Sequence, residues 1–195
     1  MKRTFDIAFS FFGIILLFPL LILIIILMVL TTKGPIIYKQ LRVGRNNNDF
    51  LIFKFRTMSV NADKLGLLTI GGRDARVTRL GFYLRKFKLD ELPQLANVLY
   101  GDMSFVGPRP EVRKYVDFYN PMQMQVLNVR PGITDLASIK YRNENELLST
   151  QEDPESYYIN FIMPKKLQIN LDYLKESNLF KDVWVIVKTF LVIIK

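Results

Sequence analysis

The adjacent carboxylates Asp90 and Glu91 are the residues best placed for chemistry, because they stand beside a strongly basic stretch of the sequence. One carboxylate of such a pair can act as a nucleophile or metal ligand while the other assists it. A purely structural interpretation is also open: Asp90 caps a helix, Glu91 lies in its first turn, and Pro93 is tolerated there. The two interpretations are compatible, since a carboxylate at a helix start is held rigidly.

Cations gather around this acidic pair, and one of them is unusually constrained. A run of charges is often only a solvated face. Arg109 differs, because Pro108 and Pro110 fix the backbone on both sides of it, and a rigid guanidinium suits two-pronged phosphate binding. Arg130, which precedes a Pro-Gly pair, is a weaker case of the same kind. The cations before the acidic pair are Lys54, Arg56, Arg73, Arg76, Arg79, Arg85, Lys86 and Lys88.

The composition narrows the chemistry further. The 195 residues include no Cys and no His, and the formal net charge is +9. The chain therefore has no disulfide, no thiolate zinc site, no cysteine nucleophile and no histidine base. Catalysis would have to use carboxylates, Lys, Arg, Tyr or hydroxyls, which favours phosphoryl chemistry. The positive charge suits an anionic partner: lipid headgroups, a phosphorylated substrate or nucleic acid.

A long apolar segment, Ile7–Leu30, predicts attachment to a membrane. As a straight helix its 24 residues would extend roughly 36 Å, enough to cross a hydrocarbon core of about 30 Å. The run is too long for a signal peptide, and no small-residue cleavage site follows it. Pro19 lies near its centre and predicts a kink or a break. Either a kinked spanning helix or a re-entrant helix hairpin fits this pattern.

The charges flanking the segment favour the re-entrant form. Lys2 and Arg3 precede it, and Lys33, Lys39, Arg42 and Arg45 follow it. Positive charge prefers the cytoplasmic side of a membrane, and here both ends carry it. Single cysteines placed at positions 2 and 33 can be labelled in intact vesicles, since the native chain has none. Labelling from opposite sides would exclude the re-entrant form.

The rest of the chain predicts one mostly helical α+β domain with a small β-hairpin and amphipathic interfacial helices. Residues 1–33 are expected to form the membrane part and residues 34–195 the cytosolic part. The expected elements are strands at 35–43 and 50–55, a loop at 66–74, a helix capped by Thr78 and running to about 87, a helix at 90–100, a loop at 101–110, helices at 111–119 and 122–128, an extended segment at 133–141, and helices at 154–175 and 180–195.

Four short motifs stand in order behind the membrane segment and together resemble the bacterial sugar transferase family, the monotopic polyprenyl-phosphate phosphoglycosyl transferases. The resemblance covers about Lys2 to Tyr141 and is to the small, single-domain members. The motifs are Lys54-Phe55-Arg56-Thr57-Met58, Leu89-Asp90-Glu91-Leu92-Pro93-Gln94-Leu95, Val106-Gly107-Pro108-Arg109-Pro110 and Arg130-Pro131-Gly132-Ile133-Thr134.

The resemblance implies an enzyme of the bacterial cytoplasmic membrane, with its catalytic domain facing the cytoplasm. It would move a sugar-1-phosphate from a UDP-sugar to undecaprenyl phosphate and release UMP, at the start of glycoconjugate synthesis. Asp90 would be the nucleophile, bearing a covalent phosphosugar, with Mg²⁺ bound near it. Glu91 would position the polyprenyl phosphate or handle its proton. Phosphate groups would be bound by Lys54, Arg56, Arg85 and Arg109.

Two positions depart from the family pattern. The membrane break is often Ser-Pro in the family, whereas this chain has Phe18-Pro19, and Phe cannot bond a carbonyl freed at the bend. The family commonly has Gly where this chain has Asp135, which adds a carboxylate near the expected sugar site. The identity of the sugar, the glycan pathway and a homodimer are left open.

A non-catalytic alternative is a membrane-tethered basic adaptor that binds anionic lipid or nucleic acid. It explains the charge and the apolar segment. It gives no reason for an acidic pair beside the basic stretch or for the Pro-Arg-Pro frame. Nucleic acid is not an expected partner, because no module with interleaved aromatics is visible.

Overall fold

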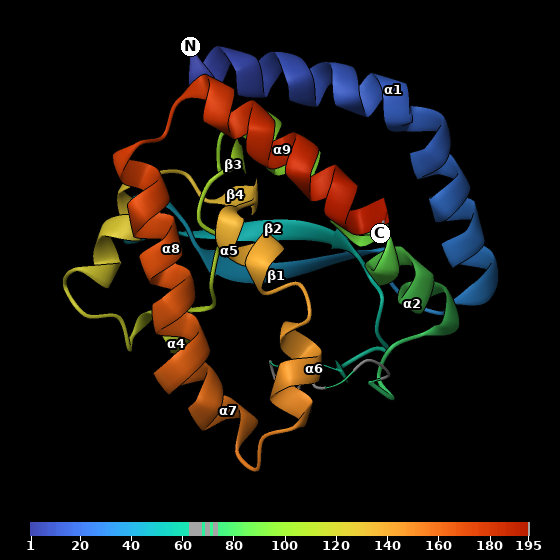
Figure 1. Cartoon of the computed structure of the whole chain (residues 1–195). Coiled ribbons are helices and arrows are strands. Elements are labelled where there is room, and N and C mark those ends of the chain that lie inside the picture. The colour runs from blue at the N-terminus through green and yellow to red at the C-terminus, as the bar shows by residue number, and fades with distance from the viewer. Residues whose placement is uncertain (63–67, 69–70, 72–73, 195) are drawn as a thin grey trace.

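The computed structural model describes residues 1–62, 68, 71 and 74–194. The fold is mostly helical, with one β-hairpin and one short parallel strand pair, as the sequence predicts in class (Figure 1). The expected loop at 66–74 lies largely outside the described residues. The β-hairpin occupies the middle of the molecule, and the long helix α1 arches over it.

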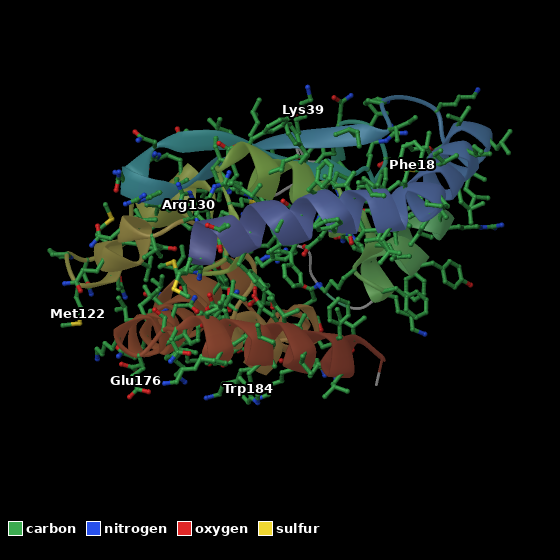
Figure 2. All side chains as sticks on the ribbon, turned by 90° about the horizontal axis from the view of Figure 1, so that it is seen from above. Phe18, Lys39, Met122, Arg130, Glu176 and Trp184 are labelled. Carbon is green, nitrogen blue, oxygen red and sulfur yellow. The ribbon has the colours of Figure 1, made fainter. Side chains whose placement is uncertain are left out.

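The apolar segment forms α1, Lys2–Thr31, a single helix of 30 residues that continues through Pro19. Figure 1 shows α1 changing direction part-way along, and Figure 2 places Phe18 beside this bend. Among the described residues, α1 alone is long and apolar enough to cross a membrane. Most of its large side chains are exposed; the buried ones are Asp6, Ser10, Ile24 and Met28. Such a large exposed apolar surface is typical of an interaction site and is consistent with the membrane attachment that the sequence predicts.

Polar side chains fasten the start of α1 to the rest of the fold. The buried Asp6 carboxylate accepts hydrogen bonds from the Ser104 hydroxyl at 3.1 Å and the Phe105 N–H at 3.2 Å. Arg3 donates to the carbonyls of Val98 and Leu99, the last turn of α3 (Gln94–Tyr100), where a cation is favoured. α1 is therefore a fixed part of the domain and not a loosely tethered anchor.

The predicted β-hairpin is confirmed. β1 (Ile37–Val43) and β2 (Asp49–Phe55) pair antiparallel, with Tyr38 opposite Lys54. The 3-10 turn η1 (Arg45–Asn47) joins them. The buried Asn97 of α3 accepts from the Phe53 N–H and donates to the Leu51 carbonyl, so α3 is bonded to the free edge of β2.

The predicted cap at Thr78 is also confirmed. Its hydroxyl accepts from the Gly81 N–H at 2.9 Å and begins α2 (Arg79–Lys86). A side chain at Gly81 would lie 2.1 Å from the Thr57 carbonyl, so this helix packs directly onto the end of β2. The expected helix at 90–100 differs: a 3-10 turn, η3 (Leu89–Glu91), comes first, and α3 follows Pro93.

Two expectations for the following segment were right only in part. The expected loop contains β3 (Ser104–Val106), which pairs in parallel with β4 (Gly132–Thr134). The segment expected to be extended over 133–141 is extended only at its start, in β4, and then turns into α5 (Leu136–Lys140), because Asp135 caps that helix through the Ser138 N–H. A pairing between strands 28 residues apart is set by tertiary contact rather than by local pattern.

The remaining helices cover one side of the β-hairpin (Figure 1). The expected helices at 111–119 and 122–128 are shorter than predicted, and the last at 180–195 is close to prediction. The 154–175 segment is helical in three pieces, with a π-helical turn before Pro164. The elements are α4 (Arg113–Val116), η4 (Gln123–Asn128), α6 (Glu144–Ser149), α7 (Pro154–Tyr157), η5 (Tyr158–Ile162), α8 (Met163–Lys175) and α9 (Leu179–Ile194).

Candidate active site

A cleft of about 1880 Å³ lies between α1 and α9 and contains the acidic pair. Figures 1 and 2 show these two helices running side by side along one face of the molecule. Their facing side chains are apolar, whereas the end of β2, α2 and η3 contribute charged groups. The apolar lining includes Phe9, Leu16, Val187 and Phe190, and the polar lining includes Lys54, Arg85, Asp90, Glu91 and Arg109.

Asp90 lies in this cleft with one carboxylate oxygen unsatisfied. The residue is 7% exposed, and its Oδ1 has no hydrogen-bond partner among the described residues. The structural interpretation of Asp90 as a helix cap therefore fails, since its side chain caps no described helix. Burial and the adjacent Glu91 charge raise the pKa of Asp90, while Lys54, Lys88 and Arg85 act against them. An uncapped, buried carboxylate surrounded by cations is suited to attack an electrophile.

Glu91 is held quite differently. Its carboxylate forms an ion pair with Lys54 Nζ at 3.2 Å and another with the Arg109 guanidinium. Burial alone would raise the pKa of Glu91, but Arg109 and Lys54 hold it well below its ordinary value. Glu91 is therefore a fixed anion that aligns two cations. It is poorly suited to accept a proton near neutral pH.

The Pro-Arg-Pro motif is positioned by the Arg-Pro-Gly motif, which is distant in sequence. The Gly107 N–H donates to the Thr134 carbonyl, and the Gly132 N–H donates to the Pro108 carbonyl. A side chain at Gly132 would lie 2.1 Å from the Gly107 nitrogen, so the two strands can approach only with glycine there. Arg109 comes shortly after β3, and its side chain reaches Glu91.

Asp135 also helps to fix the position of the Pro-Arg-Pro motif. Its Oδ2 accepts from the Arg109 N–H at 2.9 Å, and its Oδ1 accepts from the Ser138 N–H at 2.6 Å. It is 1% exposed. The carboxylate that departs from the family pattern thus fixes the Arg109 backbone and starts α5.

The other predicted phosphate-binding cations divide into two groups. Arg85 and Arg56 line the cleft: Arg85 donates to the Thr57 hydroxyl at 2.9 Å, and Arg56 donates to the Lys33 carbonyl at 2.7 Å, just after α1. Arg130 is not among the residues that line the cleft, and its Nε donates to the Gly101 carbonyl at 2.8 Å. The structure therefore does not place Arg130 in the cleft with the acidic pair, and its bond to Gly101 supports the loop after α3.

Two residues of the site, Thr57 and Lys88, were given no role of their own in the sequence analysis. Thr57 orients Arg85, and its place inside the first motif was the available signal. Lys88 precedes η3 with φ of 56°, in the left-handed region that ordinary side chains disfavour. Such local strain is frequent at functional sites, and here it turns the chain so that Asp90 and Glu91 enter the cleft. No sequence pattern indicates that conformation at a lysine.

The donor set is compatible with Mg²⁺ if a substrate contributes most of the ligands. The unsatisfied Asp90 oxygen is one suitable hard donor, whereas Glu91 is already occupied by two cations. The described residues contain no group of three or more acidic ligands. Mg²⁺ commonly binds through one or two carboxylates together with substrate phosphates and water, which this site allows.

Comparison with known proteins identifies the family of this chain. The sequence profile of the family described as Bacterial sugar transferase matches residues 1–195. The chain is 37% identical over 191 residues to the UDP-N-acetylgalactosamine-undecaprenyl-phosphate N-acetylgalactosaminephosphotransferase of Aeromonas hydrophila, covering 96% of this chain and 42% of that protein. It is 36% identical to the UDP-glucose:undecaprenyl-phosphate glucose-1-phosphate transferase of Klebsiella pneumoniae, covering 87% and 37%.

A protein of Caulobacter vibrioides bearing the same glucose-1-phosphate transferase name is 33% identical and is covered over 67% of its length, with 96% of this chain aligned. The chain spans less than half of the Aeromonas and Klebsiella proteins. The family profile covers α1, the cleft and all four motifs. The chain belongs to the bacterial sugar transferase family.

Proposed function

We propose that this chain transfers a sugar-1-phosphate from a UDP-sugar to undecaprenyl phosphate and releases UMP. The observation that carries the proposal is the buried, unsatisfied Asp90 carboxylate, which faces cations in a cleft with apolar helical walls. Both substrates carry phosphate, which the cations suit, and one of them carries a long hydrocarbon chain, which the walls suit. The relatives named above act on UDP-sugars and undecaprenyl phosphate by name.

The first step forms a bond between an Asp90 oxygen and the phosphorus that bears the sugar. The bond between that phosphorus and the oxygen of UMP breaks, and UMP leaves with the electron pair. An ionised carboxylate needs no base for this attack, so the absence of His is no obstacle. Arg85, Lys54 and Arg109 stabilise the charge that develops on the phosphoryl oxygens.

The second step regenerates Asp90. An oxygen of undecaprenyl phosphate attacks the same phosphorus, the Asp90–phosphorus bond breaks, and a lipid diphosphate sugar is released. Glu91 remains ionised and keeps Lys54 and Arg109 aligned. Of the two roles considered for Glu91, its low pKa supports positioning over proton transfer. When bound, Mg²⁺ would supply further charge neutralisation at the diphosphate, with Asp90 as its protein ligand.

We propose further that α1 enters and leaves the cytoplasmic membrane from its inner face, with the cleft at the membrane surface. The bend of α1 and the basic residues at both of its ends support this topology. The outward side of α9 carries Phe180, Trp184 and Leu191, all more than half exposed, as an interfacial helix would. The cysteine labelling described above tests the topology.

Turnover of the wild-type chain tests the proposed function. The purified protein is expected to release more than one UMP per enzyme molecule from a UDP-sugar only when Mg²⁺ and an excess of undecaprenyl phosphate are present. A panel that includes UDP-N-acetylgalactosamine and UDP-glucose identifies the preferred sugar. Absence of UMP release across the panel would contradict the enzyme and favour the basic adaptor.

Deprotonation of Lys54 is expected to reduce activity at alkaline pH. Burial lowers its pKa from 10.5 to about 8, although Glu91 opposes the change. Lys54 is charged below this value and loses its charge as the pH rises through it, so kcat/KM should fall above about pH 8. A bound diphosphate raises the pKa of a nearby ammonium, so the fall in kcat should occur at higher pH.

The matched variant is Lys54→Arg, because arginine stays charged throughout this pH range. Its kcat/KM should be lower than that of wild type but should show no fall near pH 8. The same fall in the variant would show that another group causes it.

A further inference from the structure

A second, smaller cavity of about 230 Å³ shares part of its lining with the cleft. Arg109 lines both spaces, and so do Arg42, Glu144, Asn145 and Lys166, which shows that the two adjoin. A group attached to a phosphate held at Arg109 can therefore extend into the smaller cavity. The mechanism proposed above leaves this cavity without a role.

One wall of the cavity is a preorganised polar cluster. Glu111 accepts hydrogen bonds from Arg42 Nη1 at 3.2 Å, from the Val112 N–H at 2.8 Å and from the Tyr158 hydroxyl. Arg42 is fixed further by the Pro110 carbonyl at 3.1 Å. Because these groups are hydrogen-bonded to one another, their orientations are fixed before a ligand binds. Binding therefore requires little reorganisation of this wall.

The strongest evidence that this cavity binds a ligand comes from Asn170. This α8 residue lines the cavity and is 5% exposed, yet its amide oxygen has no partner among the described residues. A buried acceptor left in this way costs about 1–3 kcal/mol, so it does not serve stability. Tyr119 also lines the cavity, and its hydroxyl has no hydrogen-bond partner among the described residues. Burial raises the pKa of Tyr119, so its hydroxyl remains a donor at neutral pH.

The size of the cavity limits what it can hold. At about 230 Å³ it is smaller than the roughly 300–1,000 Å³ of pockets that enclose drug-sized ligands. A portion of a ligand about the size of one sugar ring suits this volume better than a whole sugar nucleotide. Leu148, Met163 and Leu167 line it as well and can contact the C–H faces of such a ring.

We infer that this cavity binds the sugar of the sugar nucleotide, with Asn170 accepting a hydrogen bond from a sugar hydroxyl or amide and Tyr119 donating one. The inference rests on the proposed function. It places the sugar beyond Arg109 and the transferred phosphate between Arg109 and Asp90. Asn170 and Tyr119 are then determinants of which sugar is accepted, and they stand outside the four motifs.

Binding to the full-length protein in detergent tests this assignment. The Asp90→Asn background prevents turnover, and isothermal titration compares UDP with the UDP-sugar that gives the fastest UMP release in the panel. Asn170→Leu should weaken UDP-sugar binding about tenfold, the effect of losing one hydrogen bond. It should leave UDP binding unchanged, because UDP has no sugar. Its thermal midpoint should not fall, because the unsatisfied oxygen is removed.

Two further variants keep the test decisive. Tyr119→Phe removes a single oxygen and should weaken UDP-sugar binding without affecting UDP binding. Asn160→Leu makes the same exchange at an exposed position outside the cavity and should change neither affinity. Equal weakening of UDP and UDP-sugar, or no weakening in either cavity variant, would overturn the assignment. Failure of the proposed function would be seen separately, as absence of UMP release by wild type.

Discussion

Replacing Asp90 by Asn should lower the rate of UMP release by at least about 10⁴-fold while leaving the protein folded. Loss of a catalytic nucleophile has effects of this order, because the remaining site can only bind and polarise the substrate. The buried Asp90 oxygen has no hydrogen-bond partner to lose, and its charge is costly to bury. The thermal midpoint should therefore stay equal to that of wild type or rise.

The mass of the covalent intermediate provides a second test of the role of Asp90. Wild type mixed with its UDP-sugar and no undecaprenyl phosphate should gain the mass of one sugar phosphate, and Asp90→Asn should gain none. Asp172→Asn, at an exposed ion pair on α8, is the matched control and should behave as wild type in both assays. An Asp90→Asn protein that released UMP at the wild-type rate would exclude Asp90 as the nucleophile.

Much of the site could be predicted because its motifs carry their own local constraints. Pro108 and Pro110 hold the backbone around Arg109 in any fold, and Thr78 caps α2 through a bond within one turn. The β-hairpin followed from strand patterning on both sides of an asparagine-rich turn, where Asn46 and Asn47 adopt positive φ. These features depend on neighbours in sequence, which is why the sequence shows them.

The arrangement of charges could not be predicted, because it depends on contacts distant in sequence. Glu91 meets Lys54 from 37 residues away and Arg109 from 18 residues away. The sequence showed that acids and cations coexist. It did not show that the cations bind Glu91 and leave one Asp90 oxygen without a partner, and this difference separates the proposed nucleophile from its neighbour.

The hydrogen-bond partners of Arg56 and Arg130 could not be predicted either. Each stands in a motif and has the chemistry for binding phosphate, and each donates to a backbone carbonyl, of Lys33 and Gly101 respectively, but of the two only Arg56 lines the cleft. Such a bond from an arginine to a backbone carbonyl stabilises the fold. Nothing in a linear sequence distinguishes this use of arginine from phosphate binding.

Replacing Glu91 by Gln should have the second large effect, and it should differ in kind from that of Asp90→Asn. Gln keeps the shape of the side chain but removes the charge that Lys54 and Arg109 both need. Removing one member of a buried ion pair typically costs 3–5 kcal/mol, because the other charges stay buried without compensation. We expect a loss of about 3 kcal/mol in the free energy of unfolding, since Arg109 is one-third exposed and water screens it in part.

Activity of Glu91→Gln should fall about 10²- to 10³-fold, the range found when one preorganised electrostatic contact at a transition state is lost. Lys54 and Arg109 would no longer be aligned, but Asp90 would still form the covalent phosphosugar, only more slowly. The diphosphate of the substrate can replace the missing anion, so saturating UDP-sugar should recover more stability in Glu91→Gln than in wild type. Thermal unfolding with and without ligand measures this difference. If Glu91→Gln retained full stability and lost the covalent adduct entirely, Glu91 would take part in the chemistry itself, and the assignments of the two adjacent carboxylates would have to be exchanged.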